Sequence, residues 1–273
     1  MISLEDFLSQ IPQEDYPKQS RIHEIPFLSD KQQKWFIKRE DELGFFTSGS
    51  KIRKMRTLIP ALVLDGIEAA IVIGSAQSNN VLGMILLLIE KGIEPLPFLL
   101  KPKGQVIKGN HLFTTLSLGQ IQPVYIERQS WGQVESIASE FKETLRKKTA
   151  IIPEGSVTLN AFYGALTLAL DVVRNEKDNG IQFDHIFIDA GTGLQAAALI
   201  IGLSLLNHKA KVSVLLLADD PEKFTQTVTY WQNTLTFEQL PLKYSSFVPK
   251  GEKGFKPLSR KGFEKIIAFA QST

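Results

Sequence analysis

Three short stretches of small and polar residues combine an amine with loops that could bind an anion. Lys51 follows the small residues at 48–50 and opens an apolar-periodic helix. Two further polar loops, at 74–80 and 189–195, also open helices. A lysine amine can form a Schiff base with an aldehyde, and a helix N-terminus offers free N–H groups and a positive dipole end to an anion. Together these parts could hold an aldehyde cofactor that carries a phosphate.

Two lysines are candidates for the reactive amine. The small residues before Lys51 leave room for a bulky cofactor, and Lys54 lies one helical turn further on, beside Arg53. A nearby cation disfavours the ammonium form of a lysine and makes its amine more nucleophilic. Spacing alone therefore leaves Lys54 as the alternative to Lys51, and a solvated lysine in a helix's first turn is also compatible with the pattern.

The residues Ser78 and Asn79 suit both a structural and a binding role. Serine and asparagine are common N-cap residues, so a capped helix is expected here. In the binding role, Asn79 donates a hydrogen bond to a ring oxygen and Ser78 contacts a substrate carboxylate or moves a proton. The two roles are compatible, because a cap whose side chains face a cleft can serve both.

The glycine-rich loop that begins at Gly191 has two functional interpretations. Gly191-x-Gly193-x-x-Ala196 lies between a strand and a helix and matches the dinucleotide fingerprint. Asp219 and Asp220 follow the next strand, where a ribose-binding acid is expected. Backbone amides of the same loop could instead hold one phosphate. The motif alone does not decide between these two roles and an ordinary strand-to-helix turn. The dinucleotide fingerprint usually opens a nucleotide-binding unit, whereas this loop comes late in the chain, which counts against the dinucleotide interpretation.

Short β-branched runs alternate with helical patterns, which predicts an α/β fold. Strands are expected at 35–38, 69–73, 95–100, 121–126, 150–152, 185–189 and 212–217, and helices at 78–91, 134–147, 157–174 and 194–207. Most of the strand runs are uniformly apolar, which is typical of a parallel sheet covered by helices on both faces. A helix is also expected at 52–64, where Pro60 should end or kink it.

The expected division is a smaller α/β domain at 50–148, inserted into a larger one built from 1–49 and 149–273. The segment 101–110 reads as an exposed loop between elements.

Composition excludes several kinds of site. The chain of 273 residues has no cysteine, and its four histidines lack ligand spacing, which argues against thiolate chemistry and a zinc site. A net charge of +2 without a basic block gives little support for nucleic-acid binding. The N-terminus shows no signal peptide and no apolar run is long enough to span a bilayer, so a cytoplasmic location without membrane contact is expected.

Taken in order, these stretches resemble the 1-aminocyclopropane-1-carboxylate deaminase and D-cysteine desulfhydrase family. That family has a Lys-Arg-Glu-Asp strand end, which 38–41 match, and Gly-Gly-Asn-Lys-x-Arg-Lys-Leu, which 48–55 resemble. Its Gly-Gly-x-Gln-Ser-Asn-His/Gln motif resembles 74–80. A Pro-x-Gly-Gly/Cys-Ser segment resembles 153–156, and a phosphate loop of the Gly-Ser-Gly-Gly-Thr-Gln-Ala-Gly type resembles 191–198.

The resemblance implies a pyridoxal 5'-phosphate enzyme with two three-layer α/β domains and mainly parallel sheets, the tryptophan synthase β-like fold (fold type II). Such enzymes open a cyclopropane ring or eliminate a β-substituent from a small amino acid, and release ammonia and a 2-oxo acid. Family members commonly form homodimers. The family pattern continues into a Gly-x-x-x-Asp-Pro-x-Tyr segment after the point where this sequence ends, which implies a missing C-terminal element.

The resemblance also implies roles for single residues. Lys51 would form the Schiff base and move protons, Asn79 would bind the cofactor's ring oxygen, and Ser78 would contact the substrate carboxylate or assist proton transfer. The phosphate would be held by Gly191, Thr192, Gly193, Leu194 and Gln195, and the substrate would be met by Ser78, Asn80 and Phe255.

Several positions depart from the family pattern. Leu194 stands for a glycine, Gln195 for a phosphate-binding threonine and Phe255 for an active-site tyrosine. The departures and the missing C-terminal element keep open a catalytically inactive relative that binds pyridoxal phosphate or an amino acid. The fingerprint of the Gly191 loop keeps open a nicotinamide-dinucleotide enzyme. No residue identifies the substrate.

Overall fold

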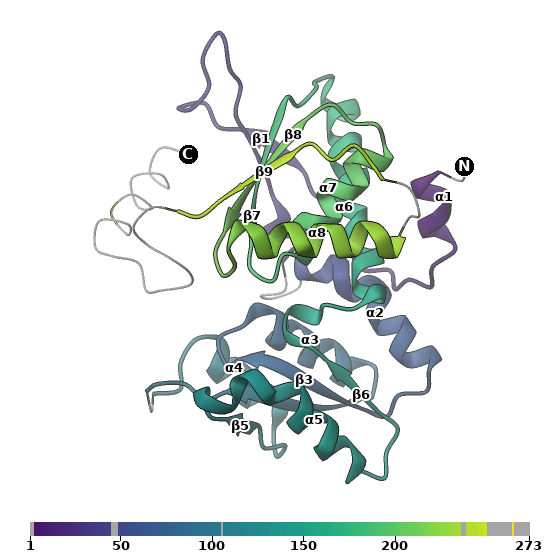
Figure 1. Cartoon of the computed structure of the whole chain (residues 1–273), viewed down its shortest axis with the longest axis vertical. Coiled ribbons are helices and arrows are strands. Elements are labelled where there is room, and N and C mark those ends of the chain that lie inside the picture. Colours follow the sequence, from purple (N-terminus) through teal and green to yellow (C-terminus); the bar gives the residue numbers. More distant parts are fainter. Residues whose placement is uncertain (1–2, 45–48, 105, 236–238, 250–263, 265–273) are drawn as a thin grey trace. The chain divides into compact units, whose positions relative to one another are not determined.

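The computed structural model describes residues 3–44, 49–104, 106–235, 239–249 and 264 (Figure 1). The chain forms two compact units. The first comprises residues 1–18 and 41–167, and the second comprises 19–40 and 168–273. The predicted smaller domain, 50–148, lies within the first unit, and the two divisions differ in where they assign 1–18, 41–49 and 149–167. The predicted domain boundaries stay a prediction.

The first unit is built on a four-stranded parallel sheet. Its strands are β3 (Ala69–Ser75), β4 (Glu94–Leu100), β5 (Val124–Ile126) and β6 (Thr149–Ile152), in the order β5-β4-β3-β6. Ile71 of the central strand β3 pairs with Leu96 on one side and Ile151 on the other. The uniformly apolar runs therefore form the parallel sheet that the sequence predicts.

Helices cover both faces of this sheet. The helices of the first unit are α1 (Leu4–Ser9), α2 (Lys51–Leu64), α3 (Asn79–Glu90), α4 (Asn110–Leu118) and α5 (Val134–Glu143), with short 3-10 turns at Glu40–Glu42, Arg128–Gln133 and Glu154–Ser156. Side chains of a strand alternate between faces. Ala70 and Val72 of β3 belong to a core with α2 and α3, whereas Ile71 and Ile73 pack with Val134 and Ala138 of α5. Figure 1 shows this sheet between α3 and α5, so the unit has three layers.

Of the two effects expected of Pro60, an end or a kink of α2, the end does not occur. The helix runs from Lys51 to Leu64 with Pro60 inside it. Proline lacks the N–H that would bind the carbonyl four residues earlier, and that carbonyl belongs to Arg56. Here the N–H of Glu14 donates to Arg56 O at 2.9 Å, which satisfies the acceptor that Pro60 leaves open.

The second unit contains a separate parallel sheet, β7-β8-β9. Its strands are β7 (His185–Ala190), β8 (Lys211–Leu216) and β9 (Tyr244–Phe247), and a two-stranded antiparallel pair is formed by β1 (Ile22–Glu24) and β2 (Phe36–Lys38). Its helices are α7 (Leu194–Leu205), α8 (Pro221–Leu235) and the later part of α6 (Leu159–Asn179). Helix α7 is apolar nearly all round and mostly buried, as expected for a core helix.

A buried ion-pair network joins β2 to α6 in the second unit. The Nζ of Lys38 lies 2.5 Å from Asp171 Oδ2 and 2.6 Å from Asn175 Oδ1. Asp171 is 3% exposed, and its carboxylate also accepts from the N–H of Ser20 and from the Arg174 guanidinium. A carboxylate so far from water needs such partners, because burying an uncompensated charge is costly.

Candidate active site

Lys51 is the first residue of α2 and follows a tight turn. Gly49 has a φ of +45°, a conformation that favours glycine, and Ser50 precedes the helix without a side-chain cap. The amine of Lys51 is half-buried and lies 3.4 Å from Ser50 Oγ. The short side chain of Ser50 lies beside the amine, and the room for a cofactor that the sequence predicts here stays a prediction. The part of this loop at Ser48 lies outside the described residues.

Lys54, the alternative amine, has a different environment. Its side chain is buried, and Nζ donates to the backbone carbonyl of Gly155 at 2.9 Å. Burial, and secondarily the positive charge of Lys51, lowers the pKa of Lys54 from 10.5 to about 7. The amine of Lys54 thus has a backbone acceptor, and close to neutral pH it gives up its proton easily.

Ser78 caps helix α3, as the sequence predicts. Its Oγ accepts from the N–H groups of Asn80 at 3.2 Å and Val81 at 3.3 Å. Asn79 is the first residue of the helix and is exposed. The helix starts just beyond the carboxyl end of β3, so these polar side chains lie at the edge of a parallel sheet where ligands usually bind.

Asn80 points into the protein interior. It is 4% exposed, and its Nδ2 donates to Ser156 Oγ at 2.8 Å. Its Oδ1 is buried without a hydrogen-bond partner among the described residues. Since Lys54 binds Gly155, the turn at Glu154–Ser156 is held by one side chain from α2 and another from α3. The substrate contact predicted for Asn80 stays a prediction.

Asn110 is a residue of this region that the sequence motifs do not include. Its Nδ2 donates to the backbone carbonyl of Gln77 at 3.0 Å and also to Asn79 Oδ1. The available signal was Gly109-Asn110 before the helical pattern of α4, at the end of a segment that the sequence analysis assigns to an exposed loop. The contact with Asn79 joins residues 31 positions apart, which no local pattern shows.

The predicted phosphate loop lies in the second unit, between β7 and α7. Gly191 and Thr192 lead to Gly193, which is the N-cap of α7 with a φ of +79° and makes no side-chain cap. A helix start without a side-chain acceptor has N–H groups to offer to an anion. Leu194 is fully buried, so the side chain that departs from the family pattern occupies the core, and Gln195 follows in the first turn.

The two aspartates of the dinucleotide interpretation have structural partners. Asp220 Oδ1 accepts from the N–H of Lys223 at 2.9 Å in the first turn of α8. Asp219 Oδ1 pairs with Lys223 Nζ at 2.6 Å. Both carboxylates thus stabilise the start of α8, and no observation favours a ribose contact.

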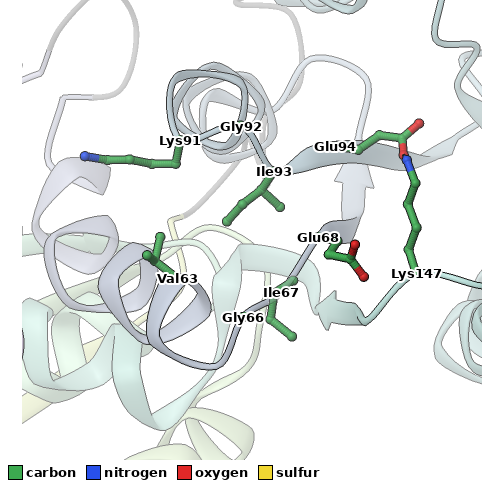
Figure 2. A pocket seen from close by; sticks show the side chains of 9 residues that line it. All are labelled: Val63, Gly66, Ile67, Glu68, Lys91, Gly92, Ile93, Glu94 and Lys147. Carbon is green, nitrogen blue, oxygen red and sulfur yellow. The ribbon is translucent and has the colours of Figure 1, made fainter.

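A surface hollow of about 450 Å³ lies away from these residues (Figure 2). It is lined by Ile67 and Glu68 before β3, by Ile93 and Glu94 at the start of β4, and by Lys147, whose amine meets Glu94. This is the amino-terminal edge of the sheet, whereas Ser78 follows the carboxyl-terminal edge. The hollow is therefore not the predicted site.

Phe255, the last predicted substrate contact, lies outside the described residues. Among those that are described, no group of histidine, aspartate or glutamate side chains could hold a metal ion. The same part of the chain contains no helix that is both long and apolar enough to cross a bilayer.

Single proteins similar to this chain carry the names of the family that the motifs resemble. No family model matches the chain. A Pyrococcus horikoshii protein assigned by name to 1-aminocyclopropane-1-carboxylate deaminase is 31% identical over 176 residues, which are 63% of this chain and 52% of that protein. The Arabidopsis thaliana bifunctional D-cysteine desulfhydrase/1-aminocyclopropane-1-carboxylate deaminase is 28% identical over 214 residues, which are 73% of this chain and 52% of the relative.

This chain is similar to proteins named as 1-aminocyclopropane-1-carboxylate deaminase and D-cysteine desulfhydrase, the family that its motifs resemble. It spans about half the length of the curated relatives it matches.

Solved structures confirm the fold of this chain. The crystal structure of an ACC deaminase homologue matches with a TM-score of 0.75 at 22% identity and covers 91% of this chain and 77% of the other. Escherichia coli diaminopropionate ammonia lyase matches with a TM-score of 0.62 at 12% identity, over 98% of this chain and 78% of the other. The predicted tryptophan synthase β-like fold, fold type II, with parallel sheets is confirmed.

Proposed function

We propose that this chain acts in a pyridoxal-phosphate-dependent deaminase or lyase, which converts a small amino acid to ammonia and a 2-oxo acid. D-Cysteine and 1-aminocyclopropane-1-carboxylate are the substrates to test first, because relatives carry the names of enzymes for both. The observation that supports this proposal most is the position of Lys51. In a chain related to these enzymes, it places a half-buried amine after a glycine turn at the start of α2.

Each unit, taken by itself, offers groups of the kind that such a cofactor needs. Lys51 would bind its aldehyde carbon, and the exposed amide of Asn79 would donate to its ring oxygen. In the second unit, the first turn of α7 begins without a side-chain cap after Gly193, so the backbone from Gly191 to Gln195 would hold its phosphate. A strand-to-helix loop with a glycine in the left-handed region is suited to an anion in this way.

When bound, pyridoxal phosphate withdraws electrons from the reacting carbon of an amino acid. The chain supplies the remaining functions. Lys51 Nζ would move a proton at that carbon, and Ser78 Oγ would contact the substrate carboxylate. Ser78 can do so while capping α3, because a hydroxyl oxygen has two lone pairs and a proton to donate.

Turnover by purified protein tests the activity. Ammonia release from D-cysteine and from 1-aminocyclopropane-1-carboxylate should depend on added pyridoxal phosphate and fall to background in the Lys51→Ala variant. Cofactor binding without ammonia from either substrate would contradict the proposed reaction and leave a binding protein.

The assembly and location are further parts of the proposal. We expect a homodimer, as is common in the family, and a cytoplasmic location. Sedimentation at several protein concentrations tests the first, and fractionation of the source cells tests the second.

A further inference from the structure

The amide group of Asn79 is oriented by a chain of hydrogen bonds that begins at a backbone carbonyl. Asn110 places an amide atom 3.0 Å from Gln77 O. A carbonyl oxygen can only accept, so the atom facing it must be Nδ2 of Asn110. The orientation of the Asn110 amide is therefore set by the main chain.

The orientation of Asn110 then sets that of Asn79. The same Nδ2 of Asn110 faces the side chain of Asn79. An amide nitrogen has two hydrogens to donate and nothing with which to accept. The facing atom of Asn79 must accordingly be Oδ1, and its Nδ2 points the other way within the amide plane. In this arrangement Asn79 presents a donor to any ligand on the side away from Asn110.

The segment just before α4 is also hydrogen-bonded to Gln77, in the loop between β3 and α3. Gln77 Nε2 donates to Lys108 O at 2.9 Å. Between these contacts Gly109 has a φ of +57°, and a Cβ added there would lie 3.0 Å from Gln77 Oε1. The backbone before Asn110 is therefore also fixed to Gln77, which restricts the position of the Asn110 side chain.

We propose that Asn110 is a positioning residue, which fixes the Asn79 amide as a hydrogen-bond donor to the ring oxygen of bound pyridoxal phosphate. This inference rests on the proposed function, because that function supplies the acceptor. Without Asn110 the Asn79 amide could rotate and present Oδ1, which would repel an electron-rich ring oxygen.

The substitution Asn110→Asp separates orientation from packing. The two side chains have nearly the same shape, but a carboxylate only accepts hydrogen bonds. It would draw Asn79 Nδ2 toward itself and turn Oδ1 toward the cofactor. Asn110→Ala merely removes the constraint and should have the smaller effect.

The test measures pyridoxal phosphate affinity and the pH dependence of the visible band of the bound cofactor. We expect Asn110→Asp to weaken binding about tenfold to a hundredfold, the loss of a hydrogen bond to a charged group, and to shift the pH at which the band titrates. In the Asn79→Ala background the same substitution should change affinity less than about twofold, because the residue through which it acts is gone. Gln77→Ala, which loosens the loop without touching the Asn79 amide, is the matched control.

Each contrary outcome has its own meaning. Wild-type affinity and an unshifted band in Asn110→Asp would overturn the inference alone. So would an equal loss in Gln77→Ala, or a loss that persists in the Asn79→Ala background, because either would make Asn110 a merely structural residue. A wild-type protein that binds no pyridoxal phosphate would refute the proposed function and this inference with it.

Discussion

At the scale of single residues, the candidate site contains two lysines in unlike surroundings. Lys51 lies half-buried beside Ser50, whereas Lys54 is buried with its amine on Gly155 O. Spacing alone could not distinguish them, because one helical turn separates them and each has a cationic neighbour that would favour a neutral amine. What distinguishes them in the described part of the chain is the turn at Glu154–Ser156, about a hundred residues away, which gives Lys54 a backbone acceptor.

Lys54 should make the stability of the protein depend on pH. Its pKa is about 7 in the folded protein and 10.5 when exposed. Below pH 7 both states hold the proton, and folding carries the full cost of burying the charge. Between pH 7 and 10.5 only the unfolded state keeps the proton, so the free energy of unfolding rises with pH, by up to about 1.4 kcal/mol per unit.

Urea unfolding at several pH values between 7 and 9 checks this. In the Lys54→Met variant the free energy of unfolding should no longer rise with pH. The stability of this variant relative to the wild type should be greatest near pH 7. Lys103→Met, at an exposed lysine, serves as the control and should leave the slope as it is. A wild-type slope that survives in Lys54→Met would show that other groups cause it.

At the scale of elements, the loop between β7 and α7 depends on one backbone conformation. Gly193 has a φ of +79°, and a Cβ added there would meet the Phe224 ring at 3.3 Å. We expect Gly193→Ala to lower the free energy of unfolding by about 1–2 kcal/mol. Gly104→Ala, at a position with open space and no positive φ, should change it by less than about 0.5 kcal/mol. Denaturant titration measures both, and equal effects would count against a strained loop.

The pairing of β2 with α6 depends on Asp171. Replacement of Asp171 by alanine removes the carboxylate 2.5 Å from Lys38 Nζ and leaves that of Glu40 at 3.9 Å, and loss of one partner of a buried ion pair costs about 3–5 kcal/mol. Asp178 binds the same Arg174 guanidinium as Asp171 does, but its side chain is 50% exposed. Asp178→Ala should therefore cost about 1 kcal/mol or less. Thermal unfolding of both variants provides the comparison, and similar losses would contradict a special role for the buried carboxylate.

The elements also show how far the sequence could be read. Uniformly apolar runs predicted β3 and β4 because both faces of a parallel strand are buried. The short, half-polar strand β9 lacks that signal and was not predicted. A helix at 52–64 was predicted, but its continuation past Pro60 could not be decided from the sequence, because the carbonyl that Pro60 leaves open is satisfied by Glu14, far away in the sequence.

At the scale of the whole molecule, the family motifs predicted the fold type more specifically than the hydrophobic periodicity did. They predicted a fold type that the solved structures confirm, although the chain spans only about half of its curated relatives. The loops can be recognised as family motifs because their glycines and helix caps lie within a few residues of one another in the sequence. Long-range contacts such as Asn110 with Asn79 have no local signature, so the surroundings of each predicted residue could come only from the structure.

The most direct test of the account is a visible absorption spectrum with added pyridoxal phosphate, followed by borohydride reduction and peptide mapping of the modified lysine. The account predicts a visible band of lysine-bound cofactor, a single reduced adduct on Lys51, and loss of both in Lys51→Ala but not in Lys54→Ala. No band, an adduct on Lys54, or adducts scattered over exposed lysines would contradict it.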